Sequence, residues 1–167
     1  MDDNAKKTAL RMIPYGIYVL TAESESGEIG SATVNWVTQT SFKPPLLVVG
    51  VKVDSGPYEI VKASGHFALN MLGKGQQGLA FAFFKPAERD GHTISGEPFR
   101  SGSSGAPLLL NAQASVECKL VEIVEQGDHH IFVGEVIDAT ITHEPEKRPD
   151  EEILEMKDLG ENVFYGG

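Results

Sequence analysis

Cysteine and basic residues are both scarce in this sequence. Its single cysteine, Cys118, excludes an intramolecular disulfide and any cluster of cysteine metal ligands. Only 14 Lys and Arg stand against 24 Asp and Glu, which gives a formal net charge of -10. Proteins that bind nucleic acid or anionic membranes neutralise phosphates with basic residues, so neither partner is expected here.

Long apolar runs are missing as well. The apolar runs, such as Leu46–Val51, are far shorter than the roughly 20 residues that span a bilayer. The lysines near the N-terminus are not followed by an apolar stretch, as they would be in a signal peptide. We therefore expect a cytoplasmic protein with no membrane partner.

The common catalytic motifs are also absent. There is no P-loop, no pair of zinc-binding residues on a helix, and no glycine-rich dinucleotide fingerprint in a βαβ setting. Ser103-Ser104-Gly105 is not typical of a nucleophile elbow, because no strand is predicted before it and no helix after it. The carboxylates show no paired spacing. The sequence thus disfavours hydrolytic chemistry and predicts no metal site.

The first half of the chain alternates apolar runs with turns. Tyr15–Ala22 and Ser31–Val37 surround a polar, glycine-containing turn and predict a β-hairpin. Leu46–Val53 follows Pro44-Pro45 and suits a buried strand, as does His66–Leu72.

Two short helices are expected between and after these strands. One begins at Ser55 and ends near Gly65, and the other lies within Gly75–Phe84. Lys85–Pro107 shows no periodic pattern and is expected to be a loop. A loop this long is a lid over a ligand, a dimer contact or mobile surface.

Two longer strands complete the pattern. Ala114–Leu120 alternates apolar and polar residues, and His130–Ile141 returns after a turn. Thr142–Glu161 is polar and charged, but the aromatic pair Phe164-Tyr165 near the end indicates docking onto an apolar surface. Many strands with short turns and a few short helices predict a mainly β protein, either a barrel or a sandwich.

The segment Ser31–Pro45, SATVNWVTQTSFKPP, is dense in hydroxyl and amide side chains around the only tryptophan. It fits a strand with its polar residues in solvent and Trp36 in the core. It also fits a site for a planar, polar ligand, in which Trp36 is an apolar wall. In that case the polar edge of the ligand meets backbone N–H groups and the side chains of Asn35, Thr38, Gln39 and Ser41.

The motifs WVTQTSFKPP, HFALNML and GDHHIFVGEV occur in this order, and the chain closes on FYGG. In these motifs the sequence resembles the flavin reductase-like proteins that have an FMN-binding split barrel, from about Met12 to the C-terminus. The resemblance implies a Greek-key split β-barrel in a single domain, residues 1–167, with the barrel in 12–143 and a C-terminal tail in 144–167. It also implies a homodimer with one FMN per subunit near the interface.

The same resemblance assigns residues to the flavin. The strand and loop beside the isoalloxazine ring match Asn35, Trp36, Val37, Thr38, Gln39, Thr40 and Ser41. Ser55 lies in the segment beside the phosphate or ribityl chain, and Lys85 matches a basic residue that balances the phosphate charge. Two positions depart from the family: Pro57 stands where a threonine is common, and Gly30 or Ser31 where an asparagine is frequent.

His129 matches a family histidine near the flavin face, where it is associated with nicotinamide binding or hydride-transfer geometry. Without the resemblance, it is a turn histidine bound by Asp128 or by backbone. Phe164 or Tyr165 covers the ring or the partner's site, or simply docks the tail into the core. Cys118 is expected to be a buried structural thiol.

The resemblance therefore implies an FMN-dependent oxidoreductase, with FMN preferred to FAD. NAD(P)H would deliver hydride to the flavin, and electrons would pass to free flavin, a partner oxygenase or another acceptor. An alternative is an electron carrier like the flavoredoxins, reduced by a protein partner that its acidic surface attracts. A third is a non-catalytic split barrel. Because FMN and NAD(P)H are anions, cations must gather locally, and the candidates are Lys85, Lys43, Lys52 and Arg89.

Overall fold

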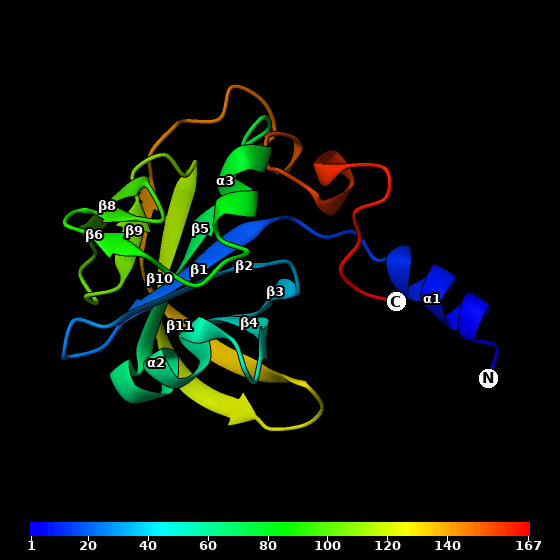
Figure 1. Ribbon diagram of the computed structural model, residues 1–167, viewed down its shortest axis with the longest axis horizontal. Coiled ribbons are helices and arrows are strands. Elements are labelled where there is room, and N and C mark those ends of the chain that lie inside the picture. Colours follow the sequence, from blue (N-terminus) through cyan, green and yellow to red (C-terminus); the bar gives the residue numbers. More distant parts are fainter.

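The computed structural model describes residues 1–167 and contains two antiparallel sheets and three helices (Figure 1). The seven-stranded sheet has the spatial order β2 (Ile29–Val34), β1 (Tyr18–Glu23), β5 (His66–Met71), β10 (Ala114–Val124), β11 (His129–Ile141), β4 (Pro45–Lys52) and β3 (Val37–Phe42). The four-stranded sheet consists of β6 (Arg89–Asp90), β7 (Thr93–Ile94), β8 (Glu97–Ser101) and β9 (Pro107–Leu109). The helices are α1 (Asp3–Arg11), α2 (Gly56–Ser64) and α3 (Gln77–Ala82), with short 3-10 turns η1 (Pro149–Glu151) and η2 (Met156–Leu159).

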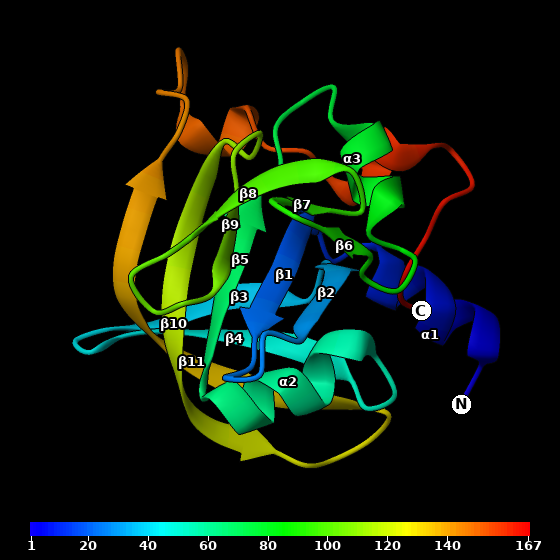
Figure 2. The same ribbon diagram turned by 60° about the vertical axis from the view of Figure 1, so that its left-hand side comes forward.

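The connection between β2 and β3 closes the large sheet into a split barrel. These two strands stand at opposite ends of the strand order, yet only Asn35 and Trp36 separate them in sequence. The sheet must therefore curl until its two edges approach each other, as Figure 2 shows. No ladder pairs β2 with β3, and the seam between them is the split. This arrangement confirms the predicted mainly β fold with a Greek-key split β-barrel and a few short helices.

Most of the predicted strands and helices are present, with one informative difference. Ser31–Val37 does not form one continuous arm of the first hairpin, because β2 ends at Val34 and β3 begins at Val37. Asn35 and Trp36 instead carry the chain from one edge of the sheet to the other. The apolar pattern alone cannot reveal this break, because both strands have similar composition.

The barrel interior contains one of two main apolar clusters. Phe67, Cys118 and Phe132 are fully buried there, and α2 covers one end with Val61. Packing is tight enough that a Cβ atom at Gly134 would lie 2.6 Å from Phe67 Cζ. Burial raises the pKa of the Cys118 thiol to about 12, so this cysteine stays protonated and structural, as predicted.

The expected loop at 85–107 is ordered, and this prediction is wrong. The segment forms β6, β7 and β8, whose residues Ile94 and Phe99 are buried in the second apolar cluster together with α3. Strands of two residues show no detectable period, so the sequence pattern could not reveal them. The turn after β8 is fixed by Glu117 of β10, which is buried and accepts hydrogen bonds from the backbone N–H and the hydroxyl of both Ser103 and Ser104.

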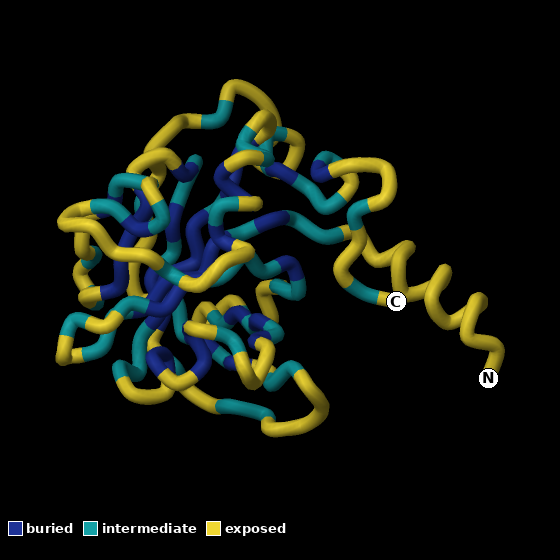
Figure 3. The backbone as a smooth tube through the Cα atoms, in the orientation of Figure 1, coloured by how far each residue is buried: buried dark blue, intermediate teal, exposed yellow.

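The C-terminus lies beside the second half of α1, with the N-terminus at the far end of that helix (Figure 1). Helix α1 begins at the cap residue Asp2, whose carboxylate accepts from Asn4 N at 2.8 Å, and it buries none of its residues (Figure 3). The C-terminal stretch is better anchored than its charge suggests, because Leu154 and Leu159 are buried. No helix is long and apolar enough to cross a membrane.

Candidate functional site

A cavity of about 370 Å³ lies at the split of the barrel. The end of β2, the end of β4, the start of α2, the end of α3 and the C-terminal stretch all contribute to its wall. Five residues that the sequence assigned to the flavin site line it, although they are distant in sequence: Asn35, Ser55, His129, Phe164 and Tyr165. The register of the sheet explains part of this convergence, since His129 at the start of β11 pairs with Lys52 at the end of β4.

Trp36, His129 and Tyr165 form an aromatic cluster at one end of the cavity. The Trp36 ring centroid lies 4.6 Å from that of His129 and 5.4 Å from that of Tyr165. The Tyr165 hydroxyl lies 2.7 Å from His129 Nε2, and Asn35 Nδ2 donates to the Tyr165 carbonyl oxygen at 3.0 Å. Trp36 is not itself part of the cavity wall: it packs behind His129 and Tyr165 and over the backbone of Gly50, where a Cβ atom would lie 3.2 Å from the indole ring.

Asp128 fixes the protonation pattern of His129. Its Oδ1 lies 2.8 Å from Nδ1, and this hydrogen bond with the imidazole lowers the pKa of the Asp128 carboxyl. An ionised carboxylate only accepts, so Nδ1 carries a proton, and in that tautomer Nε2 is an acceptor. The Tyr165 hydroxyl therefore donates to Nε2. Burial raises the pKa of that hydroxyl, which keeps it protonated.

The remaining predicted ring contacts lie along β3, outside the wall of the cavity. Thr38, Gln39 and Thr40 are exposed, and Val37 and Ser41 are half-buried. Because β3 is an edge strand, the backbone on one of its sides has no strand partner and is open to a ligand or another chain. The assignment of residues 37–41 to the flavin remains a prediction.

The four candidate cations are placed differently. Lys52 lines the cavity, 3.0 Å from the exposed carboxylate of Asp54, whereas Lys85 is exposed and only its neighbour Phe84 lines the wall. Arg89 is engaged by Glu23 at 2.9 Å, and Lys43 is exposed in the turn between β3 and β4. Of these four, the cavity geometry favours Lys52.

The two departures from the family pattern contact each other. A Cβ atom at Gly30 would lie 2.6 Å from Pro57 Cα and 2.9 Å from Gly56 O, so the start of α2 packs directly on the backbone of β2. All the crowding atoms belong to the backbone of residues 56 and 57, so no side chain has room at position 30 while α2 begins here, whichever residue stands at 57. Nearby Ser55 donates its hydroxyl to Lys52 O at 2.7 Å.

The chemistry of the wall suits a flavin. Trp36 Nε1 is buried without a hydrogen-bond partner, which is unfavourable unless an acceptor joins it. Lys52 is a suitable partner for a phosphate, and the Ser55 hydroxyl becomes one when it rotates away from Lys52 O. The sequence reasoning missed much of the apolar wall, which is made by Phe83, Met156, Leu159 and Val163. Their position depends on long-range packing of the C-terminal stretch, for which the sequence carries no local signal.

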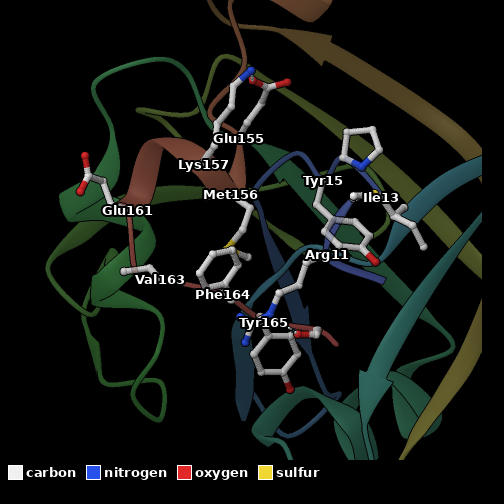
Figure 4. A pocket seen from close by; sticks show the side chains of 14 residues that line it. Arg11, Ile13, Tyr15, Glu155, Met156, Lys157, Glu161, Val163, Phe164 and Tyr165 are labelled. Atoms are coloured by element: carbon white, nitrogen blue, oxygen red, sulfur yellow. Dashed lines mark hydrogen bonds and ion pairs between the residues drawn. The ribbon is translucent and has the colours of Figure 1, made fainter. Parts of the chain in front are cut away.

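A second cavity, of about 270 Å³, lies between the end of α1 and the C-terminal stretch (Figure 4). The two cavities share Met156, Val163, Phe164 and Tyr165 in their walls. The Arg11 guanidinium lies 4.0 Å from the centroid of the Phe164 ring in this second cavity. The C-terminal stretch thus separates the two spaces.

Comparison with known proteins identifies the relatives of this chain. The family model described as "Flavin reductase like domain" matches residues 10–157. A probable flavin reductase of Rhizobium meliloti (strain 1021) is 33% identical over 135 residues, which cover 81% of this chain and 42% of that protein. The reductase subunit of stachydrine N-demethylase from the same organism is 30% identical over 135 residues, with 81% of this chain and 57% of that protein covered.

A solved structure shares the fold. The NADH:FAD oxidoreductase of Streptomyces globisporus C-1027, in complex with NAD and FAD fragments, superposes with a TM-score of 0.66 at 31% identity, covering 83% of this chain and 88% of that one. The chain spans about half the length of the two Rhizobium relatives, 42% and 57%.

Proposed function

The chain belongs to the flavin reductase-like family, and from this premise we propose that it is a flavin-dependent oxidoreductase that takes hydride from NADH or NADPH. The observation that carries the proposal is the meeting of His129, Trp36 and Asn35 at one end of an apolar-walled cavity, with Lys52 and Ser55 also in its wall. A flavin bound there would accept a hydride and pass its electrons on. FMN is the proposed form, in preference to FAD.

Each side chain has a proposed task in this site. Trp36 lies against the ring, and its free indole N–H and the Asn35 amide meet polar atoms at its edge. Residues 37–41 offer backbone groups along the open edge of β3. Lys52 and Ser55, with Lys85 at the margin, hold the phosphate. His129 orients the nicotinamide, so that the protein contributes placement rather than an acid–base pair.

The acceptor is proposed to be free flavin, a partner oxygenase or another redox protein. Similarity to the reductase subunit of an N-demethylase supports such a partner. A homodimer is proposed as well, because Phe42 at the end of β3 is 88% exposed and Ile131 and Ile137 face solvent from β11. A sedimentation mass of one chain, 18.0 kDa, would contradict it. A cytoplasmic location fits the single buried thiol.

The test of this function is anaerobic reduction. The purified protein, loaded with FMN, should lose its yellow colour when NADH or NADPH is added without oxygen. Chemical reduction with dithionite serves as the control that the bound flavin is reducible. A protein that dithionite bleaches but neither nucleotide does would contradict the proposal. Given the net charge of -10, such a result would favour the carrier that a basic protein partner reduces.

A further inference from the structure

The C-terminal residues of the chain lie over the His129 end of the cavity. We define the tail segment as Val163–Gly166, which lies between the two cavities and beside the end of α1 (Figures 1 and 4). Its Tyr165 hydroxyl donates to His129 Nε2 at 2.7 Å, and its backbone accepts from Asn35 at 3.0 Å. The tail segment thus uses the same two side chains that the proposed function gives to the flavin and the nicotinamide.

The tail segment is held less firmly than the residues before it. Leu159 is buried, and Asp158 forms an ion pair with Lys74, so η2 is fixed to the barrel. By contrast, Phe164 and Tyr165 remain 48% and 47% exposed. Glycines stand on both sides of the segment's aromatic pair, Gly160 at φ 143° and Gly166 at φ 131°. Few buried contacts and flanking glycines are the features of a segment that opens locally.

The covered state also leaves one polar group unsatisfied. Trp36 Nε1 is buried without an acceptor, and Gly166 packs against it, since a Cβ atom at Gly166 would lie 3.6 Å from this nitrogen. The polar edge of a bound flavin, or water, would pair with the indole N–H if the tail segment left. The closed state therefore has the Tyr165 hydrogen bonds, and the open state has a hydrogen bond to the indole N–H. Because these two contributions oppose each other, the open and closed states are closer in free energy.

We infer that the tail segment is a gate at His129, in which the Tyr165 hydroxyl occupies the place that a nicotinamide carboxamide takes when the hydride donor binds. This inference rests on the proposed function, because it takes His129 to be the nicotinamide side of the site. The gate admits the nucleotide only when Tyr165 leaves Nε2. Since both groups need the same acceptor, a nucleotide bound at His129 and a closed gate exclude each other.

The only tryptophan makes the gate directly observable. In a ¹⁵N-labelled, FMN-loaded sample, the indole N–H of Trp36 gives a single side-chain signal, because the chain has 1 Trp. With the gate closed, this proton should exchange slowly with water. Deletion of residues 164–167 should shift the signal and accelerate exchange at least tenfold. NAD⁺, used as a probe that cannot reduce the flavin, should move the signal of the full chain toward the position in the deletion variant.

Single substitutions supply the matched comparison. Tyr165→Phe removes the competing hydrogen bond, so NAD⁺ should bind about three- to tenfold more tightly. Tyr15→Phe is the control, since Tyr15 also lies against Gly166 but makes no hydrogen bond with its hydroxyl, and it should leave the affinity within about twofold.

Each outcome decides a different point. NAD⁺ binding with an unchanged Trp36 signal would overturn the gate and leave the proposed function in place. An unchanged signal in the deletion variant would also overturn the gate, because the tail segment would then not cover Trp36 in solution. Failure of both the full chain and the deletion variant to bind NAD⁺ would refute the proposed function together with the inference.

Discussion

The turn after β8 and the tail segment are both held by polar side chains, but in opposite ways. Under the β8 turn, the buried Glu117 carboxylate receives hydrogen bonds from two backbone N–H groups, at 3.1 Å and 2.7 Å, and from two hydroxyls. Under the tail segment, Trp36 Nε1 is buried with no partner, and the Tyr165 that binds His129 is 47% exposed. The first cluster is complete within the chain, whereas the second lacks an acceptor.

This difference separates a structural cluster from a binding site better than residue type does. A buried charge is more demanding than a histidine or a tryptophan, yet Glu117 is fully satisfied by its neighbours and needs nothing else. A buried donor left unpaired is rare in folded proteins. Ser31 Oγ and Trp36 Nε1 are both of this kind, and of the two, Trp36 packs against two residues of the cavity wall, His129 and Tyr165. By this criterion the cavity at the split, beside the Trp36 indole, is the ligand-binding site. The Glu117 cluster, which needs no further partner, has the structural task of holding the second sheet.

Removing the carboxylate of Glu117 should have the largest effect on the free energy of unfolding. Glu117→Ala removes the buried acceptor of four hydrogen bonds from Ser103 and Ser104, and we expect a loss of about 3–4 kcal/mol by chemical denaturation. Glu122→Ala, at an exposed position of the same strand, should change the free energy of unfolding by less than about 0.5 kcal/mol. If the Glu117 variant slowed flavin reduction while folded, the two clusters would not be separable.

The same variant predicts a pH dependence. Burial alone would raise the pKa of Glu117, but the hydrogen bonds from Ser104 and Ser103 outweigh it, and the pKa lies below its usual value. The stabilisation is therefore fully present above the unfolded pKa, roughly 4.3, and is lost as the pH falls through the lower folded pKa. The stability curves of the wild type and Glu117→Ala should converge in acid.

Replacing His129 should have the opposite effect to replacing Glu117. The rate of flavin reduction should fall greatly, and the free energy of unfolding should change little. His129→Ala should slow reduction of bound FMN by NADH about 100-fold, because the nicotinamide loses its orientation. The dissociation constant of FMN should change by less than about threefold, because ring and phosphate contacts remain.

The neighbouring histidine is the control for this change. His130 Nδ1 lies 2.6 Å from the Tyr58 hydroxyl, so its ring is paired with the barrel and α2 rather than with the cavity. His130→Ala should cost about 1 kcal/mol of stability and leave the reduction rate within about twofold. Equal rates for the two variants would remove His129 from its proposed role.

The sequence predicted the strands well and the site in part. The alternation of apolar and polar residues identified the two long strands. This pattern did not distinguish a barrel from a sandwich, and the family resemblance made that choice. Asn35 and His129 meet only because β2 crosses to β3 and β11 pairs with β4, and neither event has a local signal. The β6–β8 strands were missed for the same reason, since long-range packing fixes their positions, whereas the aromatic pair Phe164-Tyr165 did indicate that the tail segment docks.

The smallest expected effect distinguishes two lysines. The family pattern points to Lys85 for the FMN phosphate, and the cavity wall points to Lys52. Lys52→Gln should weaken FMN binding about tenfold, and Lys85→Gln by less than about twofold. The loss of FMN affinity caused by Lys52→Gln should be smaller at high salt, because salt screens the attraction between an exposed lysine and the phosphate.

Replacing Asp54 should change the affinity for FMN in the opposite direction to replacing Lys52. It lies 3.0 Å from Lys52 Nζ, and this hydrogen-bonded pairing raises the pKa of the lysine and keeps it charged. A phosphate must compete with the Asp54 carboxylate, so Asp54→Asn should tighten FMN binding, measured by flavin fluorescence titration. If instead Lys85→Gln weakened binding more than Lys52→Gln, the phosphate would lie outside the cavity. In that case the acceptor of the Trp36 indole would not be the flavin. An unpaired buried donor, as opposed to the satisfied Glu117 cluster, would then not mark the flavin site.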